Sequence, residues 1–502
     1  MHGTSAQSTS AEIKRTAAGL RRGDLVELIP DDLALGGAAV ARLDELVIFV
    51  EQALPGQKIL ARISKKKKNF AEAHLEKILQ PAPHQIEPRC AHFGHCGGCR
   101  WQHLDYEQQL RCKQRQVEES LRHIGGFSGL EVQPTLPSPE LYAYRNKMEY
   151  SFSPQRWVPR HELGAPREEE TALYLGLHAK GFFDKIIDVQ ACHLLPPVTN
   201  DILHAVRQFA IDSGRPAYHA RDHQGFWRFL VIRHARKTGE LMVNLVASEY
   251  DQALARDLAA RMQARFPGIT SLLFSTTQSL AGVAFSEAEY LLAGKKTITE
   301  MLGPLVFEIS SNSFFQTNTL QAERLYDIVV DYARLQPDET VYDLYCGAGT
   351  IALYVSHLVK KVVGFESVQA AVEDAQRNAA YNRIGNCSFV WGDLRDLIEN
   401  TGETIARFGR PDVLIIDPPR GGMHPKTVAA VSRLAPERIV HVSCNPATLA
   451  RDLKVLCAGP YRLTKVQPVD MFPHTAHIEV VVLLQRNPSS VQDAPITTGN
   501  DV

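Results

Sequence analysis

Short apolar runs alternate with stretches of helical periodicity along the C-terminal part of the chain. The runs are TVYDLYC, KVVGFE, SFVWGD, DVLIID and RIVHVSC, and amphipathic segments separate them. This alternation is typical of a parallel sheet covered by helices. The pattern therefore predicts an α/β domain over residues 306–486.

Strand-like runs dominate the chain before that domain. Residues 16–80 alternate apolar runs with turn signals at Gly, Asp-Asp and Pro-Gly, which predicts a small OB-like β-barrel. Within residues 81–305, the runs MEYSFS, FLVIRHA and LMVNLVA predict a mostly β central domain with a largely antiparallel sheet. Residues 104–125 instead have apolar positions at helical spacing and end at two glycines, so we expect an amphipathic helix there.

Length and composition narrow the class of protein. A chain of 502 residues with 44% hydrophobic residues and a net charge of −1 is an ordinary globular protein of several domains. With so balanced a charge, any RNA contact would depend on local patches such as Lys65–Lys68. No apolar run approaches the roughly 20 residues of a membrane span, and the polar N-terminus is not a secretory signal. We expect a cytoplasmic monomer without membrane contact, with disordered ends at residues 1–15 and 487–502.

Three of the nine cysteines have the spacing of metal ligands. Cys90, Cys96 and Cys99 follow a C-x5-C-x2-C pattern, and cytosolic thiols stay reduced. A site for zinc or an iron–sulfur cluster is a better explanation than three unrelated thiols. Either group needs a fourth ligand, and the candidates in the chain are His92, His95, Cys192 and, less favourably, Cys112.

A nucleotide-binding pattern begins at the first strand of the α/β domain. The glycine turn in DLYCGAGT is followed by a strand that ends at Glu366, where an acidic side chain binds a ribose diol. The third strand ends at Asp393, near the expected adenine edge, and the fourth ends at Asp417 in IIDPPR. Because the pyrophosphate fingerprint Gly-x-Gly-x-x-Gly is absent, S-adenosylmethionine fits this pattern better than NAD.

A cysteine at the end of the fifth strand indicates which kind of atom accepts the methyl group. Cys444 in VSCNPATLARD could be a core thiol, but its strand ends at the same sheet edge as Asp417. A thiolate there can add to C6 of a pyrimidine and so make C5 nucleophilic enough to take a methyl group. The C5 proton must then leave, and Glu479 in HTAHIEVVVLL is the candidate base. Arg420 replaces the aromatic residue that follows DPP in methylation of amino groups, so an amino acceptor is not expected.

Five stretches of the chain resemble the RNA uridine C5-methyltransferases. They are SCNPATLARD, FPHTAHIE, FFQTN, DLYCGAG and DPPRGG, and the resemblance extends over residues 16–486. It implies a Rossmann-like S-adenosylmethionine-dependent methyltransferase domain at residues 306–486. It also implies that residues 16–80 form a TRAM domain, an RNA-binding barrel, and that the helix at 104–125 packs on the catalytic domain.

The same resemblance assigns residues to roles. Cys444 is the implied nucleophile and Glu479 the implied proton acceptor. The implied contacts to S-adenosylmethionine are Gln316, Tyr345, Glu366 and Asp417. The implied ligands of a [4Fe-4S] cluster are Cys90, Cys96, Cys99 and Cys192.

Further sequence features bear on the RNA substrate and on three alternative classes of protein. Family members with both a TRAM domain and a cluster mostly act on 23S ribosomal RNA, which is the expected substrate, with transfer RNA as the alternative. A radical methylthiotransferase would need a C-x3-C-x2-C triad, and a cytosine C5-methyltransferase would have Pro before Cys444 instead of Ser443. A non-catalytic RNA-binding protein would not need Cys444 and Glu479. For RNA contacts we expect Tyr144–Ser153 and the run GFWRFLVIRHARKTGE, which interleave Arg and Lys with aromatic residues.

Overall fold

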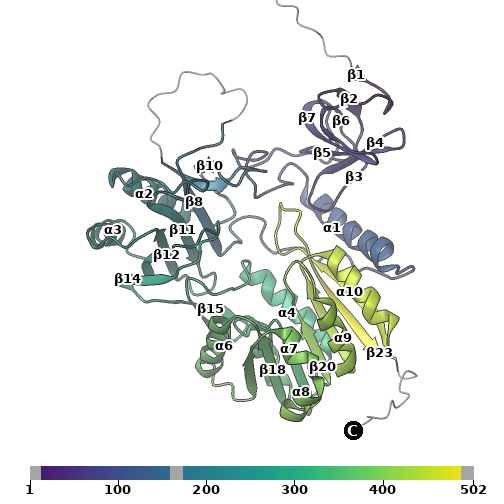
Figure 1. The fold of residues 1–502 in the computed structure, drawn as a ribbon, viewed down its shortest axis with the longest axis vertical. Helices are drawn as coiled ribbons and strands as arrows, with labels where there is room; N and C mark the ends of the chain where they lie inside the picture. The colour runs from purple at the N-terminus through teal and green to yellow at the C-terminus, as the bar shows by residue number, and fades with distance from the viewer. Residues whose placement is uncertain (1–12, 159–172, 488–502) are drawn as a thin grey trace, which may run out of the picture.

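A computed structural model describes residues 13–158 and 173–487, which form three parts (Figure 1). An N-terminal sheet, a central domain and a C-terminal α/β domain follow one another along the chain. The ends expected to be disordered, residues 1–15 and 487–502, lie outside the described residues except for 13–15 and 487. Among the described helices, none has the length and apolar character needed to cross a membrane.

The N-terminal part is a seven-stranded sheet in the order β1-β2-β6-β7-β5-β4-β3. Buried and less buried residues alternate in β5, where Leu46, Ile48 and Val50 face the core. Strand β2 also contacts β4, which brings the two sides of the sheet together around that core. The strands are β1 (Ile13–Lys14), β2 (Leu25–Leu28), β3 (Asp32–Leu33), β4 (Ala39–Leu43), β5 (Leu46–Glu51), β6 (Lys58–Lys66) and β7 (Phe70–Gln80).

The central domain has one seven-stranded sheet in the order β10-β9-β8-β11-β12-β13-β14, antiparallel except between β12 and β13. Its strands are β8 (Lys147–Ser153), β9 (Tyr174–His178), β10 (Ile186–Asp188), β11 (Trp227–His234), β12 (Leu241–Ala247), β13 (Ser271–Thr276) and β14 (Ala288–Gly294). Its helices are α2 (Val198–Asp212) and α3 (Gln252–Arg265). A separate hairpin of β15 (Ile298–Leu302) and β16 (Leu305–Ile309) leads into the α/β domain.

The aromatic and basic residues of β11 do not form the RNA-binding face expected from the sequence. Trp227 is fully buried, and Arg228 and Arg233 are only 3% and 2% exposed. Their guanidinium groups donate hydrogen bonds to main-chain carbonyls of neighbouring loops, Arg228 to Thr277 and Arg233 to Ser311. For these three residues the prediction was wrong, because the composition of a strand does not show which of its sides is covered.

The C-terminal part has a seven-stranded sheet in the order β19-β18-β17-β20-β21-β23-β22, parallel except for β23. This confirms the predicted α/β, Rossmann-like fold. Its strands are β17 (Thr340–Leu344), β18 (Lys361–Glu366), β19 (Cys387–Trp391), β20 (Val413–Ile416), β21 (Arg438–Ser443), β22 (Tyr461–Val469) and β23 (Glu479–Arg486).

Helices cover both faces of this sheet. Residues of α4, α5 and α6 share one hydrophobic core with the sheet, and residues of α7, α9 and α10 share the other. The helices are α4 (Thr319–Ala333), α5 (Thr350–Val355), the short 3-10 helix η3 (Ser356–Leu358), α6 (Gln369–Tyr381), α7 (Leu394–Glu399), α8 (Thr401–Phe408), α9 (Pro425–Leu434) and α10 (Pro446–Ala458).

One helix from the N-terminal half of the chain completes the second of these cores. Helix α1 (Tyr106–Ser120) begins at Asp105, whose side chain accepts a hydrogen bond from the Gln108 N–H. It continues into the π-helical turn η1 (Leu121–Gly125), and both pack against α10. Val117 and Leu121 are buried among residues of the catalytic sheet. The α/β domain therefore depends on a helix encoded far upstream.

Candidate active site

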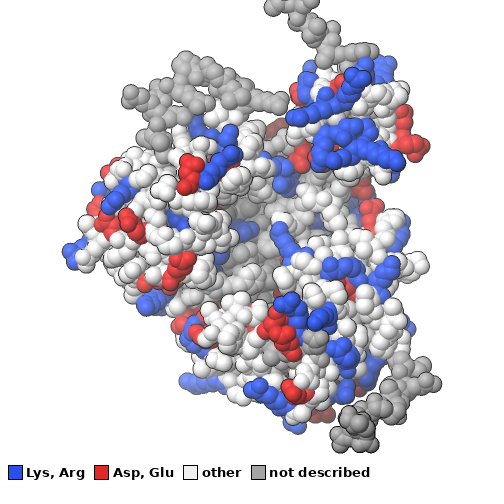
Figure 2. All heavy atoms as spheres, viewed as in Figure 1, with Lys and Arg blue, Asp and Glu red and all other residues white. Residues whose placement is uncertain are grey.

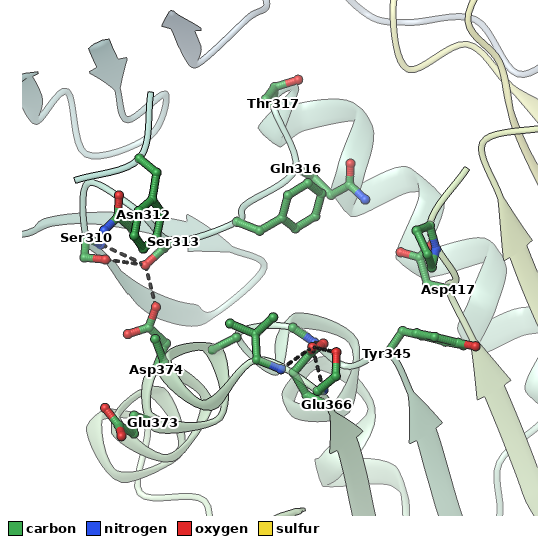
Figure 3. Close-up of a pocket in the computed structure, with 18 of the residues that line it drawn as sticks. Ser310, Asn312, Ser313, Gln316, Thr317, Tyr345, Glu366, Glu373, Asp374 and Asp417 are labelled. Atoms are coloured by element: carbon green, nitrogen blue, oxygen red, sulfur yellow. Dashed lines mark hydrogen bonds between the residues drawn. The ribbon is translucent and has the colours of Figure 1, made fainter. Parts of the chain in front are cut away.

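The carboxyl edge of the catalytic sheet opens into a cavity of about 1150 Å³. Its lining includes the implied catalytic and cofactor-binding residues, namely Gln316, Tyr345, Glu366, Asp417, Cys444 and Glu479. Figure 3 shows Gln316, Tyr345, Glu366 and Asp417 around one space, reached from different elements of the domain. The sheet therefore brings together residues that lie up to 163 positions apart, from Gln316 to Glu479.

Cys444 lies at the turn between β21 and α10. The Asn445 side chain accepts a hydrogen bond from the Ala447 N–H, and Pro446 occupies the first turn of the helix. These caps end the strand abruptly and leave the half-buried thiol at the cavity wall. Burial, together with the nearby carboxylates of Glu479 and Asp417, raises the pKa of Cys444 to about 11, while Arg420 opposes that rise.

Glu479 is the first residue of β23, the strand that pairs with β21. Ser443 lies opposite Val480 in that pairing, so Glu479 and Cys444 meet at the same end of the sheet. The Glu479 side chain is buried, and burial together with Asp417 raises its pKa well above the usual range. A carboxylate with a raised pKa is a stronger base, as removal of a carbon-bound proton requires.

Arg420 and His477 form a pair beside these two residues. The Arg420 Nη2 atom lies 3.2 Å from His477 Nδ1. Burial, and then the positive charge of Arg420, lower the pKa of His477 to about 4, so the neutral ring can accept this hydrogen bond. Arg420 is also the positive group that favours the ionised forms of Cys444 and Glu479. The sequence analysis had noted Arg420 only because it occupies a position where an aromatic residue would indicate an amino acceptor, and had given it no role.

Glu366 lies beside the glycine turn at the cavity wall. Its Oε2 accepts a hydrogen bond from the Gly347 N–H at 3.0 Å, and its Oε1 accepts from the N–H groups of Ser367 and Val368. Gly347 has a φ of +54°, a left-handed conformation that glycine adopts without strain. The carboxylate therefore has a fixed place at the glycine turn, where a ribose diol would be bound.

Asp343 is a site residue to which the sequence analysis gave no role. It is fully buried in β17 and lines a narrow extension of the cavity with Gln316, Tyr345 and Asp417. Burial, Asp417 and Glu366 raise its pKa well above the usual range, and burial raises the pKa of Asp417 to about 6. The signal in the sequence was an acidic residue inside an apolar strand.

This crowding of carboxyl groups fits a cationic cofactor. S-adenosylmethionine has a positive sulfonium and an ammonium group, which would favour ionisation of Asp343 and Asp417. Asp393, expected near the adenine, instead caps α7, and its side chain pairs with Arg395. Asp393 is not among the residues that line this cavity.

The four cysteines expected to bind a cluster lie close to one another in the central domain. Burial, together with the thiols of Cys192, Cys96 and Cys90, raises the pKa of Cys99 to about 12. Their loop pairs with the β9–β10 hairpin through a bridge between Cys96 and Ala179. Across residues 13–158 and 173–487, no group of three or more His, Cys, Asp or Glu is placed to hold a metal ion.

The other candidate ligands of that loop have different surroundings. His92 Nε2 accepts a hydrogen bond from the Gln190 N–H at 3.0 Å. Cys112 lies in α1 and packs in the core of the N-terminal sheet. One ring nitrogen of His92 is therefore already hydrogen-bonded, and Cys112 lies in a different core from the loop.

Comparison with known proteins identifies relatives over nearly the whole chain. A family described as tRNA (uracil-5-)-methyltransferase matches residues 289–487. An uncharacterized RNA methyltransferase of Chlorobaculum tepidum is 43% identical over 470 residues, which cover 93% of this chain and 97% of that protein. Another, from Porphyromonas gingivalis, is 44% identical over 462 residues, which cover 91% of this chain and 99% of that protein.

A solved structure is similar over the same extent. The tRNA (uracil-54, C5)-methyltransferase of Pyrococcus abyssi, in complex with S-adenosyl-L-homocysteine, has 28% sequence identity and a TM-score of 0.71. The similarity covers 91% of this chain and 99% of that chain, so all three parts of the fold are included.

Proposed function

The chain belongs to the family of RNA uridine C5-methyltransferases, and we propose that it methylates C5 of a uridine in 23S ribosomal RNA with S-adenosylmethionine as methyl donor. One observation carries this proposal. A single cavity is lined by a cysteine at a strand end, a buried glutamate beside it, and the carboxyl groups suited to a cationic cofactor. This is the set of groups that methylation at a pyrimidine C5 requires.

Cys444 begins the reaction as its thiolate. Its sulfur adds to C6 of the uracil, and the electrons of the C5–C6 double bond move to form an enolate through C4 and O4. With a pKa of about 11, only about one thiol in ten thousand is ionised at pH 7, so the site must favour the thiolate further when loaded. Arg420, held by the neutral ring of His477, supplies positive charge on the protein side.

Glu479 completes the reaction. S-adenosylmethionine, held by Asp343, Glu366 and Asp417, would supply the methyl group that C5 takes. Glu479 then accepts the proton from C5, the C5–C6 double bond forms again, and the Cys444 sulfur leaves C6 as a thiolate. The Glu479 side chain is buried at the cavity wall, in the same cavity as Cys444.

We propose further that Cys90, Cys96, Cys99 and Cys192 hold a [4Fe-4S] cluster. The C-x5-C-x2-C spacing of the first three cysteines and the proximity of Cys192 to Cys96 and Cys99 support this proposal. Methyl transfer requires no electron from a cluster. Its proposed role is to fix the loop at residues 90–99, which is followed directly by Arg100 and Trp101, whose N–H groups donate to the His474 carbonyl.

The N-terminal sheet, which we propose is a TRAM domain, supports RNA binding, and the resemblance to the TRAM- and cluster-containing members of the family favours 23S ribosomal RNA. Figure 2 shows Lys and Arg side chains gathered over this part of the molecule. Lys65, Lys67 and Lys68 are exposed there, as a phosphate-binding surface requires. The Pyrococcus abyssi protein is named for tRNA, so tRNA is the alternative substrate.

The test uses RNA in which uridine is replaced by 5-fluorouridine. Fluorine at C5 cannot be removed by a base, so an active enzyme with labelled S-adenosylmethionine remains covalently attached to its RNA. We expect an adduct with 23S ribosomal RNA fragments that Cys444→Ala abolishes. An adduct with tRNA alone would retain the chemistry and change the substrate. Absence of an adduct with any RNA, in protein that binds S-adenosylmethionine, would overturn the mechanism.

A further inference from the structure

Two exposed phenylalanine rings lie at the tip of the β9–β10 hairpin, outside the catalytic cavity. Phe182 is 43% exposed and Phe183 is 63% exposed. The Lys185 Nζ atom lies 5.3 Å from the centre of the Phe182 ring, and the Arg221 guanidinium carbon lies 5.4 Å from that of Phe183. We propose that this tip is a stacking site for unpaired bases of the RNA substrate, an inference that rests on the proposed function.

The tip holds its rings in a defined place. The Phe182 N–H donates to the Ala179 carbonyl at 3.0 Å, and Gly181 takes a φ of +79° to close the turn. Asp184 is buried beneath the tip and accepts a hydrogen bond from Arg221 Nε at 2.5 Å. Ordered rings lose less conformational entropy when a base stacks on them, which favours binding.

The tip of the hairpin contacts both the cysteine loop and the N-terminal sheet. The Gly97 N–H donates to the His178 carbonyl at 3.0 Å, and the Lys180 N–H donates to the His95 carbonyl at 3.1 Å. The Lys180 side chain also forms an ion pair with Glu51 of β5. The cysteine loop and the N-terminal sheet thus fix the tip from two sides. Figure 1 shows β10 at the edge of the central domain that faces the N-terminal sheet.

The charges around the rings favour RNA over a protein partner. Lys180, Lys185 and Arg221 surround the tip, whereas Asp184 and Glu51 already pair with two of them. An apolar protein interface would surround such rings with further apolar side chains, but here each ring has a cation beside it, Lys185 at Phe182 and Arg221 at Phe183. Aromatic rings beside cations bind single-stranded RNA through base stacking and phosphate pairing. Because this happens away from Cys444, it would orient the RNA without entering the chemistry.

The test compares Phe183→Leu with Phe183→Trp and with Tyr381→Leu, a matched exposed aromatic position on α6 that is 57% exposed. RNA affinity is measured by fluorescence anisotropy with a labelled substrate fragment containing unpaired bases. Loss of one stacked ring is worth about 5- to 150-fold in Kd. We expect that loss for Phe183→Leu, affinity near wild type for the other two variants, and a KM for RNA that rises while the KM for S-adenosylmethionine stays constant.

Three results would overturn the inference. The first is Phe183→Leu binding RNA within twofold of wild type. The second is Phe183→Trp losing as much affinity as Phe183→Leu, which would show that ring stacking is not involved. The third is a dimer of the wild-type protein that Phe183→Leu dissociates without a change in RNA affinity, which would assign the rings to a second copy. If the 5-fluorouridine adduct still forms at saturating RNA, the proposed function stands and only this inference fails.

Discussion

The ion pair between Lys113 and Asp470 joins α1 to residues 470–478, the segment that leads into Glu479. The Nζ and Oδ1 atoms are 2.6 Å apart, and both side chains are completely buried. Lys113 Nζ also donates to the Phe472 carbonyl at 3.2 Å, and the Phe472 N–H donates to the same Asp470 oxygen at 3.1 Å. The pair therefore fixes the turn in front of Glu479, the proposed base.

Lys113→Met keeps most of the side-chain volume and removes the positive charge. It leaves the Asp470 carboxylate buried without a cation, and breaking a buried pair in this way costs about 3–5 kcal/mol. That is a large part of the roughly 5–15 kcal/mol that stabilises a folded domain. Replacing both partners, in Lys113→Met/Asp470→Leu, should recover most of the loss because no charge then remains buried.

A matched control comes from an exposed pair of nearly equal length. Lys58 and Glu27 are 2.7 Å apart, but their side chains are 42% and 36% exposed, so Lys58→Met should change the free energy of unfolding by less than about 1 kcal/mol. The assay is urea unfolding followed by tryptophan fluorescence, since Trp101 is buried 5.8 Å from Lys113 Nζ. If Lys113→Met unfolded within about 1 kcal/mol of wild type, the reasoning would be refuted.

Four further outcomes test the site. Alkylation of Cys444 by iodoacetamide, followed by mass spectrometry, should accelerate with pH up to about 11 because only the thiolate reacts; a rate independent of pH would contradict this. Affinity for S-adenosylmethionine, measured by calorimetry, should fall as pH drops through about 6, because protonation of Asp417 removes a negative charge that the cationic cofactor needs, and Asp417→Asn should remove this pH dependence. Glu479→Gln should slow turnover by about 100- to 10,000-fold and accumulate a covalent adduct with ordinary uridine RNA, visible on a denaturing gel; free product at the normal rate would exclude it as the base. Cys99→Ser should lose iron and sulfide from anaerobically purified protein, whereas Cys112→Ser should retain both.

The sequence predicted the parts of the fold in which local pattern and environment agree. Strands and helices alternate from residue 340 onward, so the α/β sheet followed from periodicity alone. The end of β21 and the start of β23 are far apart in the sequence. They meet only because Ser443 pairs with Val480 in the sheet. The pairing of Cys444 with Glu479 was therefore implied by resemblance and the chemistry, and not by spacing.

Burial explains where prediction from sequence was wrong. Arg228 and Arg233 lie next to aromatic residues in β11, as residues of an RNA-binding face would, yet loop carbonyls satisfy them in the interior. Those carbonyls come from segments 49 to 80 residues away, which no short window of sequence includes. The sequence analysis gave Asp343 no role because its strand alone does not show that Asp417 and Glu366 lie nearby. Only the fold brings these carboxyl groups together.

The long reach of α1 has a consequence for the synthesis of this protein. Lys113 leaves the ribosome 357 residues before Asp470 does. At roughly 5–20 residues per second, α1 waits about 20–70 s before its partners on α10 and the segment at 470–478 exist. During that time Val117 and Leu121 have no catalytic sheet to cover them. These side chains therefore stay uncovered by that sheet until its strands are made, and a fragment beginning at residue 289 would lack the helix that completes its core.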